Sequence, residues 1–232
     1  MRNAKYVPRF LCLIRHGDYL QRKNVPSAYQ PFALTAKGEL QATNTASALE
    51  SFAHTNSLVF NQTIFSSELL RAWQTATIIS QHMQSEMLVD SSMLLAERSV
   101  GYAANLTVSE IEQVLESDPR YEVPRKNWKS DSHYCLPFCG AESLMQAGQR
   151  VADYLTQIAN NLVNDELAVV VGHGAAFRHA AFHLGILSMD DIAKLSMYHC
   201  EPVFLEVPEK LTEKWQHVDG KWKIRQQSEQ PD

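Results

Sequence analysis

Leu11-Cys12-Leu13-Ile14-Arg15-His16-Gly17 is the stretch that decides the fold, because a short apolar run ends there in Arg-His-Gly. Such a run, with β-branched content, is typical of a buried strand whose carboxyl end lies at the ligand-binding edge of an α/β sheet. At that end the glycine permits close backbone approach, the arginine offers a planar fork of donors for phosphate oxygens, and the histidine offers a nitrogen nucleophile. The stretch suggests phosphoryl transfer through a phosphohistidine, and the alternative is a hydrogen-bonded structural histidine at the strand end.

Two further strands are predicted to lead into charged or titratable side chains. Residues 63–67 form a strand that runs into a helix with Arg71 in its first turn, and residues 166–171 form a strand that ends in Gly-His-Gly around His173. Because the carboxyl ends of parallel strands share one edge of a sheet, these side chains are expected to meet in one pocket. The predicted pocket contains Arg15, His16, Arg71 and His173.

The remaining periodicity completes an α/β pattern. Helices are predicted over 36–53 (with a start signal at Thr35), 68–83, 107–116, 142–160 and 175–184. Further strands are predicted over 87–89 and 202–207, with a hairpin over 215–224 around an Asp-Gly turn. We expect a three-layer sandwich with a mostly parallel central sheet flanked by helices, formed by a single domain over 1–225 with a disordered tail over 226–232. The long loop over 117–139 is typical of a lid or binding loop.

Composition narrows the possible partners. The chain has 232 residues, 45% hydrophobic content and a formal net charge of −5, and its lysines and arginines are scattered. This pattern argues against a nucleic-acid or membrane-surface partner. The apolar stretch near the N-terminus is shorter than the core of a signal peptide, so a cytoplasmic location is expected.

The four cysteines do not predict a metal centre. Cys135 and Cys139 have no second pair to complete a four-ligand set, so free thiols are expected and no metal is assigned. His179 and His183 lie four residues apart, but the zincin glutamate is absent between them and core packing is the favoured interpretation.

The chain resembles the histidine phosphatase superfamily, which includes cofactor-dependent phosphoglycerate mutases and phosphatases of small phosphomonoesters. The resemblance rests on segments in the family's order at 13–17, 34–38, 66–76, Glu97 followed by Gly101, 140–144 and 169–174. These segments span the chain from about residue 10 to residue 180. The resemblance implies a phosphoglycerate mutase-like fold, a small phosphorylated substrate and no cofactor.

The resemblance also implies a role for each site residue. His16 would take the phosphoryl group, Arg15, Arg71 and His173 would bind its oxygens beside Gly174, and Glu97 would protonate the leaving alcohol and then activate water. Electrostatic neutralisation and positioning are what phosphoryl transfer requires most, and the neighbouring cations favour the neutral, nucleophilic form of His16. Two rival acids are Glu68 and Glu142, of which Glu142 is expected to cap or order the following helix. Arg178 is expected to support the site without touching the substrate.

The resemblance leaves the reaction open between hydrolysis and mutase chemistry. Mutases carry a tyrosine, a lysine and two arginines where this chain has Val100, Val108 and the pair Asp118 and Pro119. Because a mutase must retain a doubly anionic intermediate, these differences favour a phosphatase, although Arg120 lies next to the missing pair. Alternatives are a 2,3-bisphosphoglycerate-dependent phosphoglycerate mutase and, in another class, a non-catalytic phospho-ligand sensor or adaptor.

Substrate identity is not determined by the sequence. A phosphoprotein substrate and a homo-oligomeric state are both compatible with it. Six cations in the two loops expected to cover the pocket are candidates for reading a second anionic group: Arg22, Lys23, Arg120, Arg125, Lys126 and Lys129.

Overall fold

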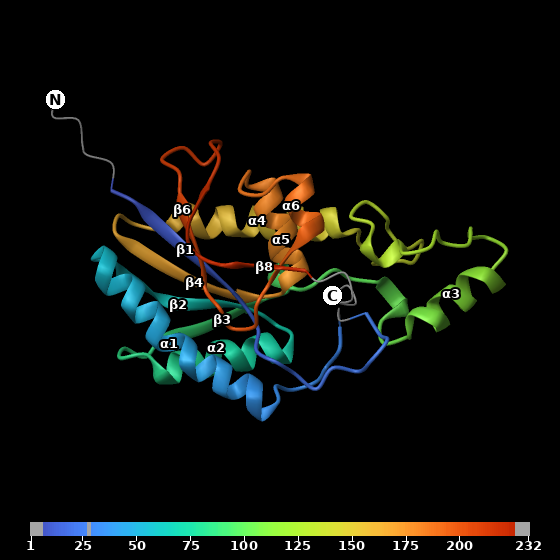
Figure 1. Cartoon of the computed structure of the whole chain (residues 1–232), viewed down its shortest axis with the longest axis horizontal. Helices are drawn as coiled ribbons and strands as arrows, with labels where there is room; N and C mark the ends of the chain where they lie inside the picture. The colour runs from blue at the N-terminus through green and yellow to red at the C-terminus, as the bar shows by residue number, and fades with distance from the viewer. Residues whose placement is uncertain (1–6, 27–28, 226–232) are drawn as a thin grey trace.

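The computed structural model describes residues 7–26 and 29–225. The central sheet has six strands in the order β3-β2-β4-β1-β6-β7 (Figure 1). The strands are β1 (Arg9–Arg15), β2 (Val59–Ser67), β3 (Leu88–Ser92), β4 (Glu166–Gly172), β6 (Val203–Val207) and β7 (Gln216–Gly220). The first four strands of that order are parallel, whereas β6 runs antiparallel to β1. The expectation of an α/β fold with a mostly parallel central sheet is confirmed.

Helices cover both faces of the sheet, which gives three layers (Figure 1). The helices are α1 (Ala36–Asn56) and α2 (Leu70–His82) on one face, and α4 (Leu144–Asn161) and α5 (Gly174–His183) on the other. The sequence of β1 produces this arrangement because successive strand side chains point to opposite faces. Leu11 and Leu13 pack with α4 and α5, whereas Cys12 and Ile14 pack with α1 and α2. All four cysteines are free thiols, as expected.

The start of α1 fixes the chain that follows β1. Thr35 is the N-cap, and its side chain accepts a hydrogen bond from the backbone nitrogen of Gly38 at 3.1 Å. A Cβ on Gly38 would lie 1.9 Å from the Asp18 carbonyl oxygen, and one on Gly17 would lie 2.6 Å from the Gly38 carbonyl oxygen. Two glycines therefore allow backbone to pack on backbone directly after the Arg-His-Gly motif.

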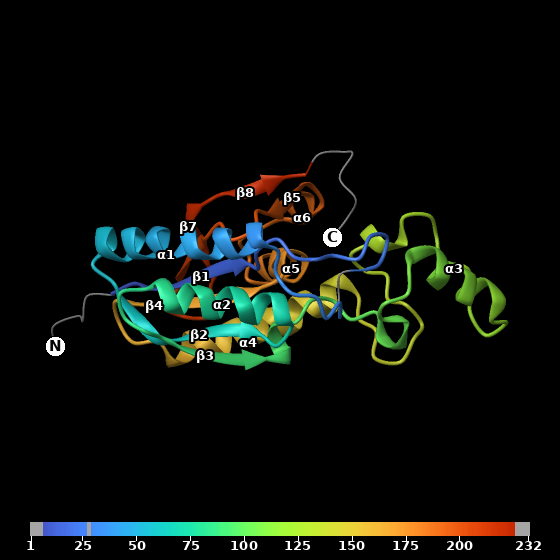
Figure 2. The same cartoon turned by 90° about the horizontal axis from the view of Figure 1, so that it is seen from below.

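A lobe formed by residues 100–141 lies beyond the carboxyl ends of β1, β2 and β3 (Figure 2). It contains α3 (Val108–Ser117) and the short turns η2 (Gly101–Ala103) and η3 (Trp128–Ser130), and it has its own apolar cluster, which includes Ile111, Leu115 and Trp128. Trp128 Nε1 donates to Glu112 Oε1 at 3.0 Å, so the predicted loop over 117–139 is attached to α3. That the loop acts as a lid stays a prediction.

The predicted hairpin over 215–224 is wrong. β7 pairs with β6 in the large sheet, whereas β8 (Trp222–Ile224) pairs with β5 (Leu195–Met197) in a separate two-stranded sheet. Gly220, the last residue of β7, has a φ of +86°, and a Cβ there would lie 2.1 Å from the Pro202 carbonyl oxygen. The Asp-Gly pair therefore directs the chain from one sheet to the other instead of reversing it.

Two short elements, α6 (Met189–Lys194) and β5, were not predicted, because neither is long enough to show periodicity. The local signal for α6 is a capping box between Ser188 and Asp191. η1 (Met93–Leu95) follows β3 and leads to Glu97. The tail over 226–232 lies outside the described residues, and no helix within 7–26 and 29–225 has the length and apolar character needed to cross a membrane.

Candidate active site

The register of β1 and β4 brings two predicted site histidines together. Arg15 is paired with Gly172, the last residue of β4, so His16 and His173 each follow directly at the same sheet edge. The backbone nitrogen of His16 donates to the Gly172 carbonyl at 3.0 Å, and the two imidazole centroids lie 5.1 Å apart. Residues far apart in sequence thus share one buried pocket.

His16 is held in a single tautomer. Its side chain is buried, and its Nδ1 lies 2.8 Å from the Gly17 carbonyl oxygen. Because a carbonyl only accepts, Nδ1 carries the proton and Nε2 carries the lone pair. Burial, and then the positive charge of Arg71, hold the pKa of His16 well below its ordinary value of 6.5. The residue is therefore a neutral imidazole with a nucleophilic Nε2.

Arg71 connects the two histidines. It lies in the first turn of α2, fully buried, where its Nε donates to His16 Nε2 at 3.1 Å and its Nη2 lies 3.3 Å from His173 Nδ1. Its Nη1 donates to the Gln30 carbonyl at 3.0 Å, and its guanidinium lies 4.7 Å from the centroid of the Tyr19 ring. These contacts fix the plane of the guanidinium over the pocket.

The tautomer of His173 follows from Arg71. Because a guanidinium only donates, His173 Nδ1 accepts, and its Nε2 donates to Ser67 Oγ at 2.9 Å. Burial, followed by the charge of Arg71, lowers the pKa of His173 well below 6.5. Both pocket histidines are therefore neutral beside a permanent cation.

The side chain of Arg15 lies directly against Gly174. A Cβ on Gly174 would lie 3.1 Å from Arg15 Cδ, so the glycine leaves room for the arginine side chain. Arg15 Nη1 donates to the Met197 carbonyl at 3.0 Å. Gly174 is the first residue of α5, so the positive end of that helix also faces the pocket.

Glu97 lies at the same end of α5 and is buried. Its Oε1 accepts from the backbone nitrogen of Arg98 at 2.9 Å, and its Oε2 accepts from the backbone nitrogen of Ala175 at 3.3 Å. Burial lowers the pKa of Arg71, and Tyr19 and Glu97 act in the opposite direction, so Glu97 interacts with Arg71 across the pocket. Of the rival acids, Glu68 is exposed and Glu142 is bound elsewhere.

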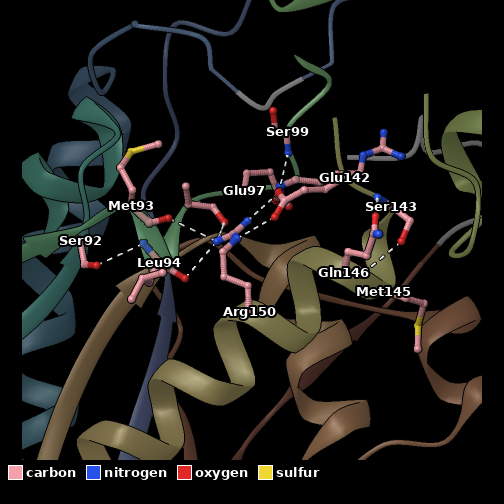
Figure 3. A network of polar contacts seen from close by, with 12 residues as sticks. Ser92, Met93, Leu94, Glu97, Ser99, Glu142, Ser143, Met145, Gln146 and Arg150 are labelled. Carbon is pink, nitrogen blue, oxygen red and sulfur yellow. Dashed lines mark hydrogen bonds and ion pairs between the residues drawn. The ribbon is translucent and has the colours of Figure 1, made fainter. Parts of the chain in front are cut away.

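Figure 3 shows where Glu142 is engaged. Arg150 on α4 donates from Nε to Glu142 Oε1 and from Nη2 to Glu142 Oε2, both at 2.8 Å. Its Nη1 donates to the carbonyls of Met93, Leu94 and Ala96 at 3.0 to 3.3 Å. Arg150 therefore holds the segment that ends at Glu97.

Of the expectation that Glu142 caps or orders the following helix, the capping is wrong, whereas the ion pair with Arg150 does attach Glu142 to α4. Ser143 is the N-cap of α4, in a capping box with Gln146, whereas Glu142 lies outside the helix and accepts from the backbone nitrogen of Ser99 at 3.1 Å. Ser143 has the side chain that this cap geometry prefers. Glu142 also orders the chain after Glu97.

Sequence reasoning missed His199, which lies between β5 and β6. Its Nδ1 donates to the His16 carbonyl at 2.6 Å, and the two ring centroids lie 5.4 Å apart. No motif surrounds this histidine in the sequence, so no local signal could have identified it. Tyr19 was also missed, although it follows the Arg-His-Gly motif closely and its ring packs edge-on against that of His16.

His179, His183 and Arg178 hold the surrounding structure. His179 is fully buried, with Nδ1 bound to the Ala175 carbonyl at 2.7 Å and Nε2 lying 3.0 Å from Ser132 Oγ. His183 Nε2 lies 3.0 Å from the Met145 carbonyl. Arg178 is buried and donates to the Leu195 carbonyl at 2.7 Å. Within the described part of the chain, no three His, Cys, Asp or Glu side chains form a group that could hold a metal ion.

Comparison with known proteins gives the family. The model of the histidine phosphatase superfamily (branch 1) matches residues 11–217. The chain belongs to this superfamily. It is similar to the 2,3-bisphosphoglycerate-dependent phosphoglycerate mutase of Parvibaculum lavamentivorans, with 24% identity over 207 residues, covering 88% of this chain and 93% of that protein. It is also similar to the 2,3-bisphosphoglycerate-dependent phosphoglycerate mutase 2 of Lactobacillus johnsonii. The identity is 29% over 210 residues, which cover 83% of this chain and 90% of that protein.

Solved structures of other proteins share the fold of this superfamily member. Mycobacterial hydrolase 2 matches with a TM-score of 0.70 and 18% identity, covering 96% of this chain and 94% of that one. The alpha-ribazole phosphatase from Shigella flexneri matches with a TM-score of 0.69 and 20% identity. The match covers 90% of this chain and 94% of that one. At these identities the structural matches establish the fold alone, and the choice of reaction depends on the chain's own residues.

Proposed function

We propose that this chain hydrolyses a phosphomonoester through a phosphohistidine on His16. The observation that carries the proposal is the state of His16, a buried neutral imidazole whose Nε2 lone pair faces the guanidinium of Arg71. A neutral nitrogen nucleophile next to fixed cations has the electrostatics that an anionic phosphoryl group requires.

In the first step the His16 Nε2 lone pair attacks phosphorus, and the bond between phosphorus and the alcohol oxygen breaks. The incoming group would replace the contact between Arg71 Nε and His16 Nε2, so that Arg71 donates to phosphate oxygens together with Arg15, His173 and the backbone of Gly174. Glu97, in its protonated form, gives its proton to the departing alcohol oxygen.

In the second step water attacks phosphorus and gives a proton to the Glu97 carboxylate. The N–P bond breaks, its electron pair returns to His16 Nε2, and inorganic phosphate leaves. The neutral tautomer of His16 is restored because Nδ1 keeps its proton on the Gly17 carbonyl. The sequence of steps balances with water as the second substrate and needs no oxidant or reductant.

Hydrolysis is favoured over mutase chemistry by the lobe. Arg120, which lies next to the missing mutase arginines, forms a salt bridge to Asp118 at 2.6 Å, with 73% of its side chain exposed. Val100, at the position of the mutase tyrosine, is buried in the apolar cluster of the lobe. These residues offer little to retain a bisphosphate during reorientation. The sequence similarity to mutases keeps mutase chemistry as the second candidate.

The test is hydrolysis of 4-nitrophenyl phosphate in the presence of chelator, with acid-quenched and base-quenched trapping of the phosphoenzyme. The parent protein should turn over and form an acid-labile, base-stable phosphoenzyme, and His16→Ala should do neither. His54→Ala, an exposed histidine on α1, is the matched control.

Conversion of 3-phosphoglycerate to 2-phosphoglycerate with added bisphosphoglycerate, at a rate above hydrolysis, would favour the mutase. Saturable binding of phosphorylated ligands with no phosphoenzyme and no turnover would instead favour a sensor.

A further inference from the structure

Thr75 is a fully buried residue of α2 that has no part in the mechanism proposed above. Its hydroxyl group donates to the Arg71 carbonyl at 2.7 Å and accepts from the backbone nitrogen of Gly17 at 3.0 Å. Arg71 is the cation that contacts the proposed nucleophile, and Gly17 follows that nucleophile in the chain. One side chain therefore joins the two backbone segments that carry His16 and Arg71.

Only one of these two bonds is ordinary for a threonine in a helix. Such a hydroxyl often donates to the carbonyl four residues earlier, and Thr77 does so on the same helix, to the Trp73 carbonyl at 2.9 Å. The bond from Gly17 is different, because Gly17 lies 58 residues earlier in the chain and belongs to another element. Its buried N–H group needs a partner, and the free lone pair of the Thr75 hydroxyl supplies one.

The backbone of Gly17 is fixed from more than one side. A Cβ on Gly17 would lie 2.6 Å from the Gly38 carbonyl oxygen, so α1 packs directly against this residue. Its N–H group is bound to Thr75 on α2, and its carbonyl oxygen lies 2.8 Å from His16 Nδ1. Gly17 therefore transmits the position of α2 to the imidazole of His16.

Four hydrogen bonds close a cycle through these residues. Arg71 Nε donates to His16 Nε2, and His16 Nδ1 donates to the Gly17 carbonyl. The Gly17 nitrogen donates to Thr75 Oγ1, which donates back to the Arg71 carbonyl. Each member donates to the next in the same sense, over distances of 2.7 to 3.1 Å. The cycle therefore fixes the backbone of Arg71 relative to the imidazole that its guanidinium contacts.

An incoming phosphoryl group would open one of the four bonds, the one between Arg71 Nε and His16 Nε2. The other three bonds do not involve the reacting nitrogen, so they would keep the guanidinium within reach of a phosphoryl group on His16. Such positioning matters, because a displacement of about 1 Å can cost about 10²-fold in rate.

We propose that Thr75 is a positioning residue for phosphoryl transfer. Its hydroxyl group holds the backbones of Gly17 and Arg71 at a fixed separation, and it thereby keeps the guanidinium beside His16 Nε2 before and after the phosphohistidine forms. This inference rests on the proposed phosphatase function, and it adds to that function a residue that touches neither the substrate nor the reacting atoms.

The experiment compares kcat/KM for 4-nitrophenyl phosphate in three variants. Thr75→Val replaces the hydroxyl group with a methyl group, Thr75→Ser keeps the hydroxyl group, and Thr77→Val removes a hydroxyl group with only the bond inside α2. Thr75→Val should lose about tenfold to a hundredfold, as expected for an unsatisfied buried donor and a displaced cation. Thr75→Ser should recover most of this loss, and Thr77→Val should equal the parent.

Three results would overturn the role of Thr75 while the phosphatase proposal stands. These are a parent value of kcat/KM in Thr75→Val, an equal loss in Thr75→Ser, and an equal loss in Thr77→Val. Thermal unfolding checks that every variant is folded. If Thr75→Val does not fold, Thr75→Cys takes its place, because a thiol is a weak donor and a weak acceptor.

A measurement without substrate separates the two proposals. Proton NMR follows the exchange of the His16 Nδ1 proton with water, and the resonance is assigned by its loss in His16→Asn. In Thr75→Val this proton should exchange faster, because the Gly17 carbonyl that accepts it is no longer held from α2. Thr75→Ser and Thr77→Val should keep the parent rate.

This exchange rate decides the case even if the parent hydrolyses no phosphate and the proposed function fails. Faster exchange in Thr75→Val alone supports the hydrogen-bonded cycle. Equal exchange in the parent and in all three variants overturns it.

Discussion

Arg71 Nε donates to His16 Nε2 across 3.1 Å, so the cation lies directly on the nitrogen that the proposed mechanism uses as its nucleophile. Burial, and then the positive charge of Arg71, lower the pKa of His16 and keep that nitrogen unprotonated in the resting site. The contact also places the guanidinium where the phosphoryl oxygens would arrive. In the proposed mechanism one side chain would thus prepare the nucleophile and receive the charge that develops around it.

Replacing Arg71 with glutamine should change both properties. We expect kcat/KM to fall by about 10² to 10³, as for loss of a fixed donor in a site that stabilises developing charge. The pKa of His16 should rise toward 6.5, but only in part, because burial is the larger cause of its depression. Proton NMR titration of the imidazole measures the shift. Arg22→Gln, in the exposed loop after β1, is the control and should leave the pKa of His16 unchanged.

Glu97→Gln should separate the two chemical steps. An aryl phosphate has a good leaving group and depends less on the acid, so phosphohistidine should form and then accumulate for lack of a base. An alkyl phosphate needs the acid in the first step, and its turnover should fall by about 10² to 10⁴. Rapid-quench kinetics with both substrates measures the burst. Unimpaired alkyl turnover in this variant, or an equal loss in Glu68→Gln, would exclude the assigned role of Glu97.

Arg150→Met should reduce activity, although Arg150 is assigned no contact with the substrate. Its role is to hold the segment that ends at Glu97. The loss of its bonds to Glu142 and to three carbonyls should lower the free energy of unfolding by about 2 kcal/mol and release the chain before Glu97. Urea unfolding and kcat measure the two effects. Arg150→Lys should restore little, because an ammonium cannot form the fork.

The control for Arg150→Met is Arg120→Met. This change removes the salt bridge between Arg120 and Asp118, which lies at an exposed position. Its unfolding curve should match that of the parent, because exposed pairs contribute little. Equal destabilisation in both variants would show that the Arg150 network has no special structural role.

Stability should fall as the pH is lowered below 6.5. The folded-state pKa of His16 and of His173 is well below 6.5, and that of His179 is lowered to about 4, mainly by burial in each case. Below pH 6.5 the unfolded chain therefore binds protons that the folded chain does not, and each histidine lowers the free energy of unfolding by an amount that approaches about 1.4 kcal/mol per pH unit.

Urea unfolding between pH 7.5 and pH 5 measures this effect. His173→Asn should flatten the dependence, whereas replacement of the exposed His54 should not. A parent protein that is equally stable at both ends of this range would contradict the neutral state assigned to the buried histidines.

Much of the site could be predicted because it follows buried strands. Arg15, His16 and His173 each lie at or just beyond a strand end, and Arg71 lies in the helix turn after another, so the parallel register alone brings them together. His199 could not be predicted, because it lies in a segment without periodicity and meets the end of β1 through an isolated parallel bridge to Arg15. The prediction of a hairpin over 215–224 failed for a related reason. The Asp-Gly turn signal is local, whereas the pairing of β7 with β6 and of β8 with β5 depends on residues distant in sequence.

The central place of β1 has a consequence for synthesis on the ribosome. β1 is made first, yet its sheet neighbours are β4 and β6, which are made much later, since Phe10 pairs with Leu167 and Glu206. β2, the next strand to emerge, pairs with β3 and β4 instead. The apolar segment that carries the proposed nucleophile therefore waits without a strand partner for most of translation, and a chaperone that covers extended apolar segments would be most useful to this chain during that interval.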